Sequence, residues 1–460
     1  MKVLLINPNI SSDSPWAMKE PIPPMGLMYI AAVLEESGNK VKIIDALLEK
    51  LDQIDLSRRI INFNPDIVGI TTDSANFLES LKVAKLAKNS LNAVVVMGGP
   101  HVTVMPDEVI QYPEVDIAVI GEGEYTMLDI VQRLDKGKSL KGCKGTWIKE
   151  NGKVIQNSLR ERINLDELPF PARHLIPMEK YTRTYTHGGL AKPVDHMNTS
   201  RGCPYDCSFC SSRIIWGQKY KARSPKSIVD EIEYLTKEYG TRGIYFREDN
   251  FTLDRKRIID ICREIQRRGI KISWECSSRA DLVDESLLKE MYRAGCRAIW
   301  YGIESGSTRT LDILNKQITI EQSREAVKLT REAGIKVGGS FIIGVPGETI
   351  EDIKLTLDLI KELHCEPTAY HYFYAIPVSR LYLEIKEKRM FDSAYGDILF
   401  VKNDKFDRDF LMKLITQSHN EIYGHKIKKR AGLARRAYRR ARRLLSTVTR
   451  PFKKNRDSRK

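Results

Sequence analysis

The chain has 460 residues, of which 42% are apolar and 29% charged, so it is too long for one hydrophobic core and too apolar to be disordered. Its net charge of +15 comes from residues 426–460, which hold 16 Lys and Arg and one acidic residue, while residues 1–425 are neutral overall. This distribution excludes a basic protein body built to grip nucleic acid. No run of 18 apolar residues exists and residues 1–10 are too short for an export signal, so we expect a cytoplasmic protein.

Residues 1–135 alternate short apolar runs with helical patterns. The runs are rich in β-branched residues and are continuous rather than alternating, as in strands that helices cover on both faces. Five such units in succession predict an α/β fold with a doubly wound parallel sheet. We expect the strands at residues 3–8, 40–46, 66–72, 93–99 and 117–121.

Small and polar residues follow these predicted strands, and the ligand of such a sheet binds beyond the carboxyl ends of its strands. Gly98 and Gly99 have no Cβ and would let the backbone approach a bulky ligand, although they serve equally well as a plain strand-to-helix turn. The candidate ligand-binding residues of this domain are Thr72, Ser74, Gly98, Gly99, His101, Gly121 and Glu122.

Residues 136–192 are rich in turn signals and are predicted to form a linker with a small hairpin around residues 146–155. Six strand-like runs with five helical stretches between them follow in residues 193–380. They favour a partial (β/α)6 barrel over a closed barrel of eight strands. A carboxyl-terminal helical segment, in which we expect substrate choice to reside, is predicted at residues 381–425, before the basic tail at 426–460.

Cys203, Cys207 and Cys210 lie directly after the first strand of the second series. Three thiolates at spacings of four and three residues can bind one metal centre. A zinc site would need a fourth Cys or His nearby, and residues 211–225 contain none. An iron–sulfur cluster bound by three cysteines keeps one iron open, whereas electron carriers use four. The spacing therefore favours a 4Fe-4S cluster with an open iron over three unrelated structural cysteines.

This CxxxCxxC motif, with Phe209 before its third cysteine, resembles the signature of the radical S-adenosylmethionine (SAM) superfamily. The resemblance extends over residues 190–380. It implies that the open iron binds the amino and carboxylate groups of SAM, and that reductive cleavage yields methionine and a 5'-deoxyadenosyl radical. It also implies an external reductant such as flavodoxin or ferredoxin.

The same resemblance implies which residues bind SAM. Glu248 and Asp249 stand where the family has a motif near the SAM amino group; the sequence departs from that motif, and either residue could be the ligand. Arg279 resembles the residue that pairs with the SAM carboxylate, for which a guanidinium has suitable bidentate geometry. Glu304 resembles the acid that binds the ribose hydroxyls, and Gly344 begins a loop similar to the one that packs against adenine.

The amino-terminal segment resembles the cobalamin-binding domain that precedes the barrel in a large group of this superfamily. The similar segments are residues 23–45, 69–72, 95–103 and 118–124. Cobalamin domains that ligate cobalt have a histidine in the loop after the first strand, and residues 7–16 contain none. We therefore expect cobalamin to bind without a histidine ligand to cobalt. His101 is expected either to contact the nucleotide tail of cobalamin or to cap the helix that begins near Pro106.

The basic tail is predicted to be a separate functional element. If residues 433–448 are helical, small and apolar side chains share one stripe and arginines surround it, which is typical of helices that lie on membrane surfaces. Contact with an anionic membrane is the preferred interpretation. A solvated tail and a nucleic-acid contact are the alternatives, and the scarcity of aromatic residues disfavours nucleic acid.

Together these features predict a cobalamin-dependent radical SAM methyltransferase. Its expected substrate is an unactivated carbon of an amphiphilic small molecule, such as a lipid or a tetrapyrrole, and its expected location is the cytoplasm, peripheral to the membrane. A non-methylating oxidoreductase or cyclase of the same architecture is the first alternative. A binding protein that senses cobalamin or redox state is the second.

Overall fold

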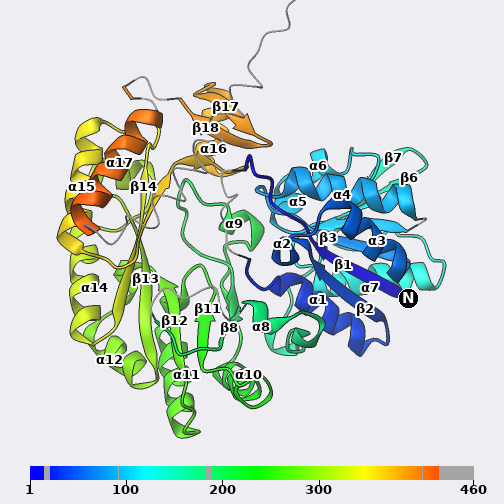
Figure 1. The fold of residues 1–460 in the computed structure, drawn as a ribbon, viewed down its shortest axis with the longest axis horizontal. Helices are drawn as coiled ribbons and strands as arrows, with labels where there is room; N and C mark the ends of the chain where they lie inside the picture. Colours follow the sequence, from blue (N-terminus) through cyan, green and yellow to red (C-terminus); the bar gives the residue numbers. More distant parts are fainter. Residues whose placement is uncertain (15–20, 92, 182–188, 403–404, 407, 424–460) are drawn as a thin grey trace, which may run out of the picture.

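The computed structural model describes residues 1–14, 21–91, 93–181, 189–402, 405–406 and 408–423. Two α/β domains lie side by side, and a small antiparallel sheet lies beside their junction (Figure 1). Within the described residues, no helix combines the length and the apolar character needed to cross a bilayer. The amphipathic helix expected at residues 433–448 lies outside the part of the chain that is described.

A seven-stranded sheet of order β2-β1-β3-β4-β5-β6-β7 forms the amino-terminal domain. Its first five strands pair in parallel, which confirms the predicted doubly wound sheet and all five of its strands. These strands are β1 (Lys2–Asn7), β2 (Lys40–Asp45), β3 (Ile67–Thr71), β4 (Val94–Gly98) and β5 (Ile117–Val119).

Helices cover both faces of this sheet because its strands bury alternate residues on opposite sides. In β1, Val3 and Leu5 join the core beneath α1 (Met25–Glu36) and α7 (Glu124–Asp135). Leu4 and Ile6 join the other core, beneath α3 (Gln53–Phe63) and α4 (Phe77–Ser90). The remaining helices of the domain are α2 (Ala46–Glu49), α5 (Pro100–Val104) and α6 (Pro106–Val109).

The hairpin expected in the linker is formed by β6 (Thr146–Glu150) and β7 (Lys153–Gln156). It is not separate from the first domain, because β6 pairs antiparallel with β5. The amino-terminal sheet therefore continues to Gln156, beyond the boundary expected at residue 135. The chain then passes through α8 (Met178–Tyr181) to the second domain.

Six parallel strands in the order β15-β14-β13-β12-β11-β8 form the second domain and confirm the partial barrel. The strands are β8 (Val194–Met197), β11 (Gly243–Phe246), β12 (Ser273–Ser278), β13 (Cys296–Glu304), β14 (Lys336–Ile343) and β15 (Thr368–Tyr372). Helices cover the outer face of the curved sheet (Figure 1). They are α10 (Pro225–Glu238), α11 (Arg255–Arg267), α12 (Glu285–Arg293), α14 (Ile320–Glu332) and α15 (Ile350–Leu363).

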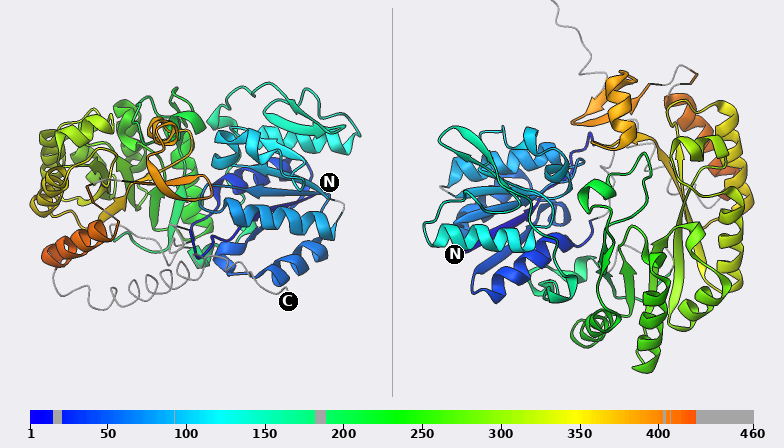
Figure 2. Two further views of the ribbon diagram at one scale, coloured as in Figure 1. Left: turned by 90° about the horizontal axis from the view of Figure 1, so that it is seen from above. Right: turned by 180° about the vertical axis from the view of Figure 1, so that it is seen from behind.

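The carboxyl-terminal segment is not purely helical, contrary to expectation. Between α16 (Arg380–Glu387) and α17 (Arg408–Tyr423) it forms β17 (Phe391–Tyr395) and β18 (Ile398–Val401), which pair antiparallel and add to β16 (Tyr374–Ala375). The turn between β17 and β18 uses Gly396 at φ +54°. Apolar residues of β18 and α16 share a core, and this small sheet lies beside both domains (Figure 2).

Candidate functional site

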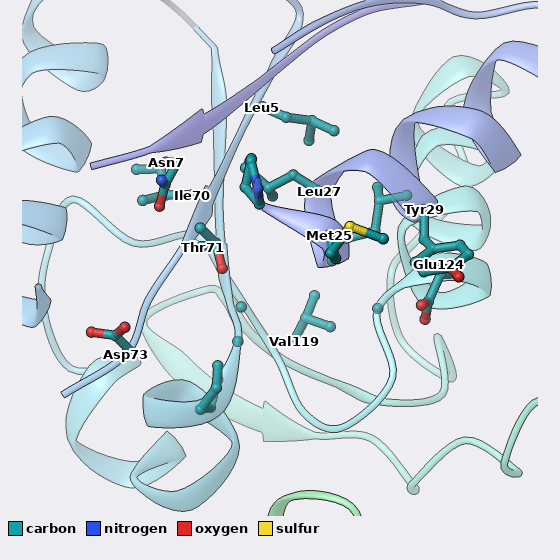
Figure 3. A pocket seen from close by; sticks show the side chains of 18 of the residues that line it. Leu5, Asn7, Met25, Leu27, Tyr29, Ile70, Thr71, Asp73, Val119 and Glu124 are labelled. Atoms are coloured by element: carbon teal, nitrogen blue, oxygen red, sulfur yellow. The ribbon is translucent and has the colours of Figure 1, made fainter. Parts of the chain in front are cut away.

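A cavity of about 430 Å³ lies between the carboxyl ends of the amino-terminal strands and the rim of the barrel. Figure 3 shows Thr71 and Asp73 on one side of this cavity and Tyr29 and Glu124 on the other. Both domains contribute polar side chains to it. Those from the barrel side are Asn198, Arg201, Trp216, Arg247 and Asp249.

Four of the predicted residues of the amino-terminal domain line this cavity, namely Gly98, Gly99, Gly121 and Glu122. Gly99 has a φ of +105°, and a Cβ there would lie 2.8 Å from the backbone oxygen of Thr72. Only glycine therefore fits at this turn, for a reason of backbone packing. Gly121 also has a positive φ, but a Cβ there would meet open space.

Thr72, Ser74 and His101 are not among the residues that line the cavity. Thr72 is fully buried, and Ser74 Oγ lies 3.0 Å from His101 Nδ1. Burial lowers the pKa of His101 to about 4, so its ring is neutral near pH 7 and has no charge to offer a phosphate. The neighbouring positions Thr71 and Asp73 face the cavity instead, which the spacing of the motif alone did not indicate.

The three predicted cluster cysteines lie in a loop that a short ladder closes. Arg201 in β9 (Ser200–Arg201) pairs antiparallel with Lys221 in β10 (Lys221–Ala222). Gly202 has a φ of +91°, and a Cβ there would lie 2.5 Å from the backbone oxygen of Lys219, so the loop can close only with glycine at this position. Cys203, Cys207 and Cys210 are all half-buried in this loop.

Burial raises the pKa of each of these three thiols, and the charge of another of the three cysteines raises each pKa further. Cys210 Sγ also accepts a hydrogen bond from the backbone N–H of Ser212 at 3.4 Å. Nearby cations, Lys316 and Arg279, lower the pKa of Cys207. Burial thus disfavours free thiolates in this loop, while the neighbouring positive charges and the N–H donor are contacts of the kind that support thiolates bound to an iron–sulfur cluster.

Among the described residues, no three His, Cys, Asp or Glu side chains converge closely enough to hold one metal ion. A cluster in which each cysteine binds a different iron does not need that convergence.

Glu248 and Asp249 occupy different environments. The Glu248 carboxylate accepts hydrogen bonds from the Thr199 backbone N–H at 2.9 Å and from the hydroxyls of Thr199 and Ser200, and it lies 3.6 Å from Arg257 Nη2. Asp249 instead lines the cavity. Burial, and then the charge of Glu248, raise the pKa of Asp249. Asp249 is therefore the member of the pair that faces both the cavity and the cysteine loop.

Arg279 lies beside the cysteine loop with its guanidinium carbon 3.7 Å from the ring centroid of Tyr205. Its Nε donates to Asp281 at 2.9 Å and its Nη2 to the Lys316 carbonyl at 2.9 Å. The remaining Nη1 is buried, and no described residue accepts a hydrogen bond from it. A buried guanidinium nitrogen without an acceptor is costly, so a ligand carboxylate would fit there.

The last two predicted SAM contacts lie at the ends of β13 and β14. Glu304 has a positive φ of +67° and accepts a hydrogen bond from Lys316 Nζ at 2.8 Å, with both side chains 8% exposed. Gly344 has a φ of +88°, and its N–H donates to Glu348 Oε2 at 2.6 Å. Burial raises the pKa of Glu348 to about 7. Lys316 was not predicted, because nothing in its local pattern marks it.

Comparisons with known proteins agree with this architecture. Residues 197–360 match the radical SAM superfamily and residues 17–131 match the B12 binding domain. An uncharacterised methyltransferase of Pyrococcus horikoshii is 41% identical over 83% of this chain and 82% of its own length. An anaerobic magnesium-protoporphyrin IX monomethyl ester cyclase of Rubrivivax gelatinosus is 30% identical over 93% of this chain and 78% of its own length.

Two solved structures share the fold. The radical SAM methyltransferase TsrM of Kitasatospora setae, with cobalamin and a 4Fe-4S cluster bound, has a TM-score of 0.71 at 23% identity, over 84% of this chain and 75% of its own. The cobalamin-dependent enzyme OxsB, with aqua-cobalamin and SAM bound, has a TM-score of 0.75 at 20% identity, over 97% of this chain and 71% of its own. The chain is therefore an enzyme of the radical SAM superfamily and belongs to its cobalamin-dependent methyltransferase family.

Proposed function

We propose that this enzyme methylates a carbon atom of a small molecule in the cavity between its two domains. When bound, the cluster, SAM and cobalamin supply a 5'-deoxyadenosyl radical and a transferable methyl group. The observation that carries the proposal is that one cavity is lined by the glycine turns of the B12-binding domain and by Asp249, beside the cysteine loop. A substrate held there would touch both halves of the protein.

The barrel residues are proposed to divide the work of holding the cluster and SAM. Cys203, Cys207 and Cys210 would hold the cluster. The positive charges of Lys316 and Arg279 near Cys207 support this assignment, because they favour a thiolate. Arg279 would bind the SAM carboxylate through Nη1, and Asp249 would accept from the SAM amino group. Glu304 would bind the ribose hydroxyls, and Gly344 would pack against the adenine. Glu248 would hold the neighbouring backbone in place through its hydrogen bonds with Thr199 and Ser200.

The amino-terminal domain is proposed to hold cobalamin without a histidine ligand to cobalt. Residues 7–16 contain no histidine. His101 makes its contacts with Ser74 and Asp397 and is absent from the cavity lining, which supports this reading. The proposed cobalamin contacts all line the cavity, and they are Gly98, Gly99, Gly121, Glu122, Thr71 and Asp73. Thr72, Ser74 and His101 do not line it, and they would hold these contact residues in position.

The test is anaerobic. The protein with a reconstituted cluster is mixed with hydroxocobalamin and SAM, reduced, and assayed by absorption and by product analysis. We expect bound cobalamin and 5'-deoxyadenosine, with deoxyadenosine lost in the Cys203→Ala, Cys207→Ala, Cys210→Ala triple variant. SAM cleavage by a protein that does not bind cobalamin would refute the methyltransferase proposal. Absence of any SAM cleavage would instead favour the sensing alternative.

A second candidate function is an oxidation or ring closure without methylation. The observation that favours it is the 30% identity to the magnesium-protoporphyrin ester cyclase over 93% of this chain. A tetrapyrrole or another amphiphilic molecule is the proposed substrate class in either case, with flavodoxin or ferredoxin as the reductant. Product mass separates the two reactions, because methylation adds one methyl group and ring closure adds none.

The basic tail is proposed to bring the enzyme to an anionic membrane surface. Its 16 basic residues within 35 support this, since each Lys or Arg near a charged leaflet contributes about 1 kcal/mol. Sedimentation with phosphatidylserine vesicles tests the proposal. Equal binding of the full chain to neutral and anionic vesicles would refute it.

A further inference from the structure

Arg201 forms an ion-pair bridge between the two domains. Its Nη1 lies 2.8 Å from Glu122 Oε1, and its Nη2 lies 2.5 Å from Glu124 Oε1. The three side chains are 11%, 13% and 4% exposed, so water screens these contacts far less than at a surface. Burial lowers the pKa of Arg201, but the carboxylates of Glu124 and Glu122 raise it by more, and the guanidinium stays charged.

The bridge is held in place from both sides. Glu122 Oε2 accepts a hydrogen bond from the Ile163 backbone N–H at 2.8 Å, and Glu124 is the first residue of α7. The guanidinium carbon of Arg201 lies 5.9 Å from the ring centroid of Tyr29 and 5.4 Å from that of Trp216. A planar guanidinium that meets two carboxylates and two rings has few alternative positions.

Arg201 is also tied to the cysteine loop. It lies in β9, two residues before Cys203, and the intervening Gly202 has no space for a side chain. The preceding residue, Ser200, donates to Glu248, whose neighbour Asp249 lines the cavity. A shift of Arg201 would therefore move the wall of the cavity and the start of the cysteine loop together.

A second buried ion network joins the linker to the barrel. Arg173 Nε lies 3.0 Å from Asp195 Oδ2, and Arg173 Nη2 lies 2.8 Å from Glu231 Oε1. None of these three residues lines the cavity, whereas Arg201, Glu122 and Glu124 all line it. The Arg201 bridge thus acts at the cavity itself, and the Arg173 network supports the fold away from it.

We propose that Arg201 is a positioning residue that sets the separation between the B12-binding domain and the cysteine loop, so that one cavity occupant contacts both. This inference rests on the proposed function, in which cobalamin lies in this cavity. The role requires a fork that meets two carboxylates at once, which lysine cannot reproduce. Arg201 contributes position, and it takes no part in bond making.

The test compares Arg201→Gln, Arg201→Lys and Glu124→Gln with the control Arg324→Gln. Arg324 also forms a two-point ion pair, with Glu362 at 2.7 Å and 2.9 Å, but on the outer helices where both side chains are exposed. Three readouts are taken on the full chain with a reconstituted cluster. They are hydroxocobalamin affinity by absorption titration, hydrogen exchange in residues 120–124 and 198–203, and the rate of 5'-deoxyadenosine formation.

We expect Arg201→Gln to weaken hydroxocobalamin binding by about tenfold, since breaking a buried ion pair leaves charges without partners. Exchange should rise in both segments, and the fold loss in hydroxocobalamin affinity should exceed the fold loss in deoxyadenosine formation, because the cluster cysteines and the proposed SAM contacts all belong to the barrel. Arg201→Lys should recover part of the affinity. Arg324→Gln should change none of the three readouts.

Unchanged affinity together with unchanged exchange in Arg201→Gln and Arg201→Lys would overturn the inference. So would exchange that rises throughout both domains with a parallel loss of SAM cleavage, because that result indicates a general loss of stability. Failure of the unmutated protein to bind hydroxocobalamin would contradict the proposed function instead. In that case the exchange of the two segments still decides whether Arg201 holds the domains together.

Discussion

His101 Nε2 lies 3.6 Å from Asp397 Oδ2, which places a buried histidine of the B12-binding domain beside the turn between β17 and β18. The other ring nitrogen lies 3.0 Å from Ser74 Oγ, and the ring packs against Phe77 with centroids 4.1 Å apart. The turn of the carboxyl-terminal sheet therefore lies against the first domain here, but neither Nε2 nor Oδ2 has a hydrogen-bond partner among the described residues. The histidine that the sequence marked as a ligand candidate thus has a structural position between two parts of the fold.

The burial of His101 predicts a pH dependence of stability. Burial lowers the pKa of His101 from 6.5 to about 4, so the unfolded chain binds a proton more readily than the folded one. The free energy of unfolding should therefore be highest above pH 6.5 and should fall as the pH drops toward 4, with a limit of about 3 kcal/mol from this group. Urea unfolding at several pH values measures this loss.

The His101→Gln variant provides the comparison, because it has no group that titrates in this range. It should be less stable than the natural sequence at pH 7 and should show a smaller loss between pH 6.5 and 4. Equal pH slopes for the two proteins would show that His101 does not supply this dependence.

Gly99 should be the least replaceable glycine of the cavity. A Cβ at this residue would lie 2.8 Å from the Thr72 backbone oxygen and 2.9 Å from its nitrogen, and φ is +105°. We expect Gly99→Ala to lower the free energy of unfolding by about 3 kcal/mol. At Gly137, φ is +59° with nothing within 4 Å, so Gly137→Ala should cost about 1 kcal/mol from the backbone alone. Similar losses in urea unfolding would refute the steric argument.

The cluster cysteines and the core cysteines should respond oppositely to replacement. The triple variant Cys203→Ala, Cys207→Ala, Cys210→Ala should lose the iron–sulfur absorption but little unfolding free energy, since its side chains are half-buried. Cys262 is fully buried in the barrel core, so Cys262→Ala should keep the absorption and lose about 1 kcal/mol. Retained iron absorption in the triple variant would exclude these residues as the cluster ligands.

The regular strands of the two parallel sheets could be predicted from the sequence, whereas the small antiparallel sheet near the carboxyl end could not. Continuous apolar runs identified the five parallel strands of the first domain, because burial on both faces leaves that pattern in the sequence, and six strand-like runs predicted the six strands of the barrel. The three-stranded carboxyl-terminal sheet was missed, since β16 has only two residues and β17 is largely exposed, so neither shows a period. These two strands form because they pair with β18 and because the sheet packs against α16.

Among the site residues, those in a local motif could be predicted from the sequence, and those that meet only in the folded chain could not. The cysteine spacing marked the cluster loop, but Arg201 pairs with Glu122, 79 residues earlier, and no local pattern records such a partner. The choice between Glu248 and Asp249 was also undecidable from the sequence. Adjacent residues of an extended segment face opposite ways, and only the fold shows that Thr199 and Ser200 meet Glu248 while Asp249 reaches the cavity.

Arg279 provides the most direct test of SAM binding. Its Nε and Nη2 are used by Asp281 and by the Lys316 carbonyl, which fixes the guanidinium and leaves the buried Nη1 without an acceptor among the described residues. Arg279→Gln removes that donor, so we expect the dissociation constant of SAM to rise by about tenfold or more. Arg279→Lys should recover little of the affinity, because an ammonium cannot keep both existing hydrogen bonds and still offer a donor to SAM in the planar geometry of a guanidinium.

The control is Arg255→Gln, which breaks an exposed ion pair with Asp284. Calorimetric titration of SAM into the reconstituted protein measures the effect. SAM affinity in Arg279→Gln equal to that of the control, with cluster absorption intact in both, would place the SAM carboxylate elsewhere.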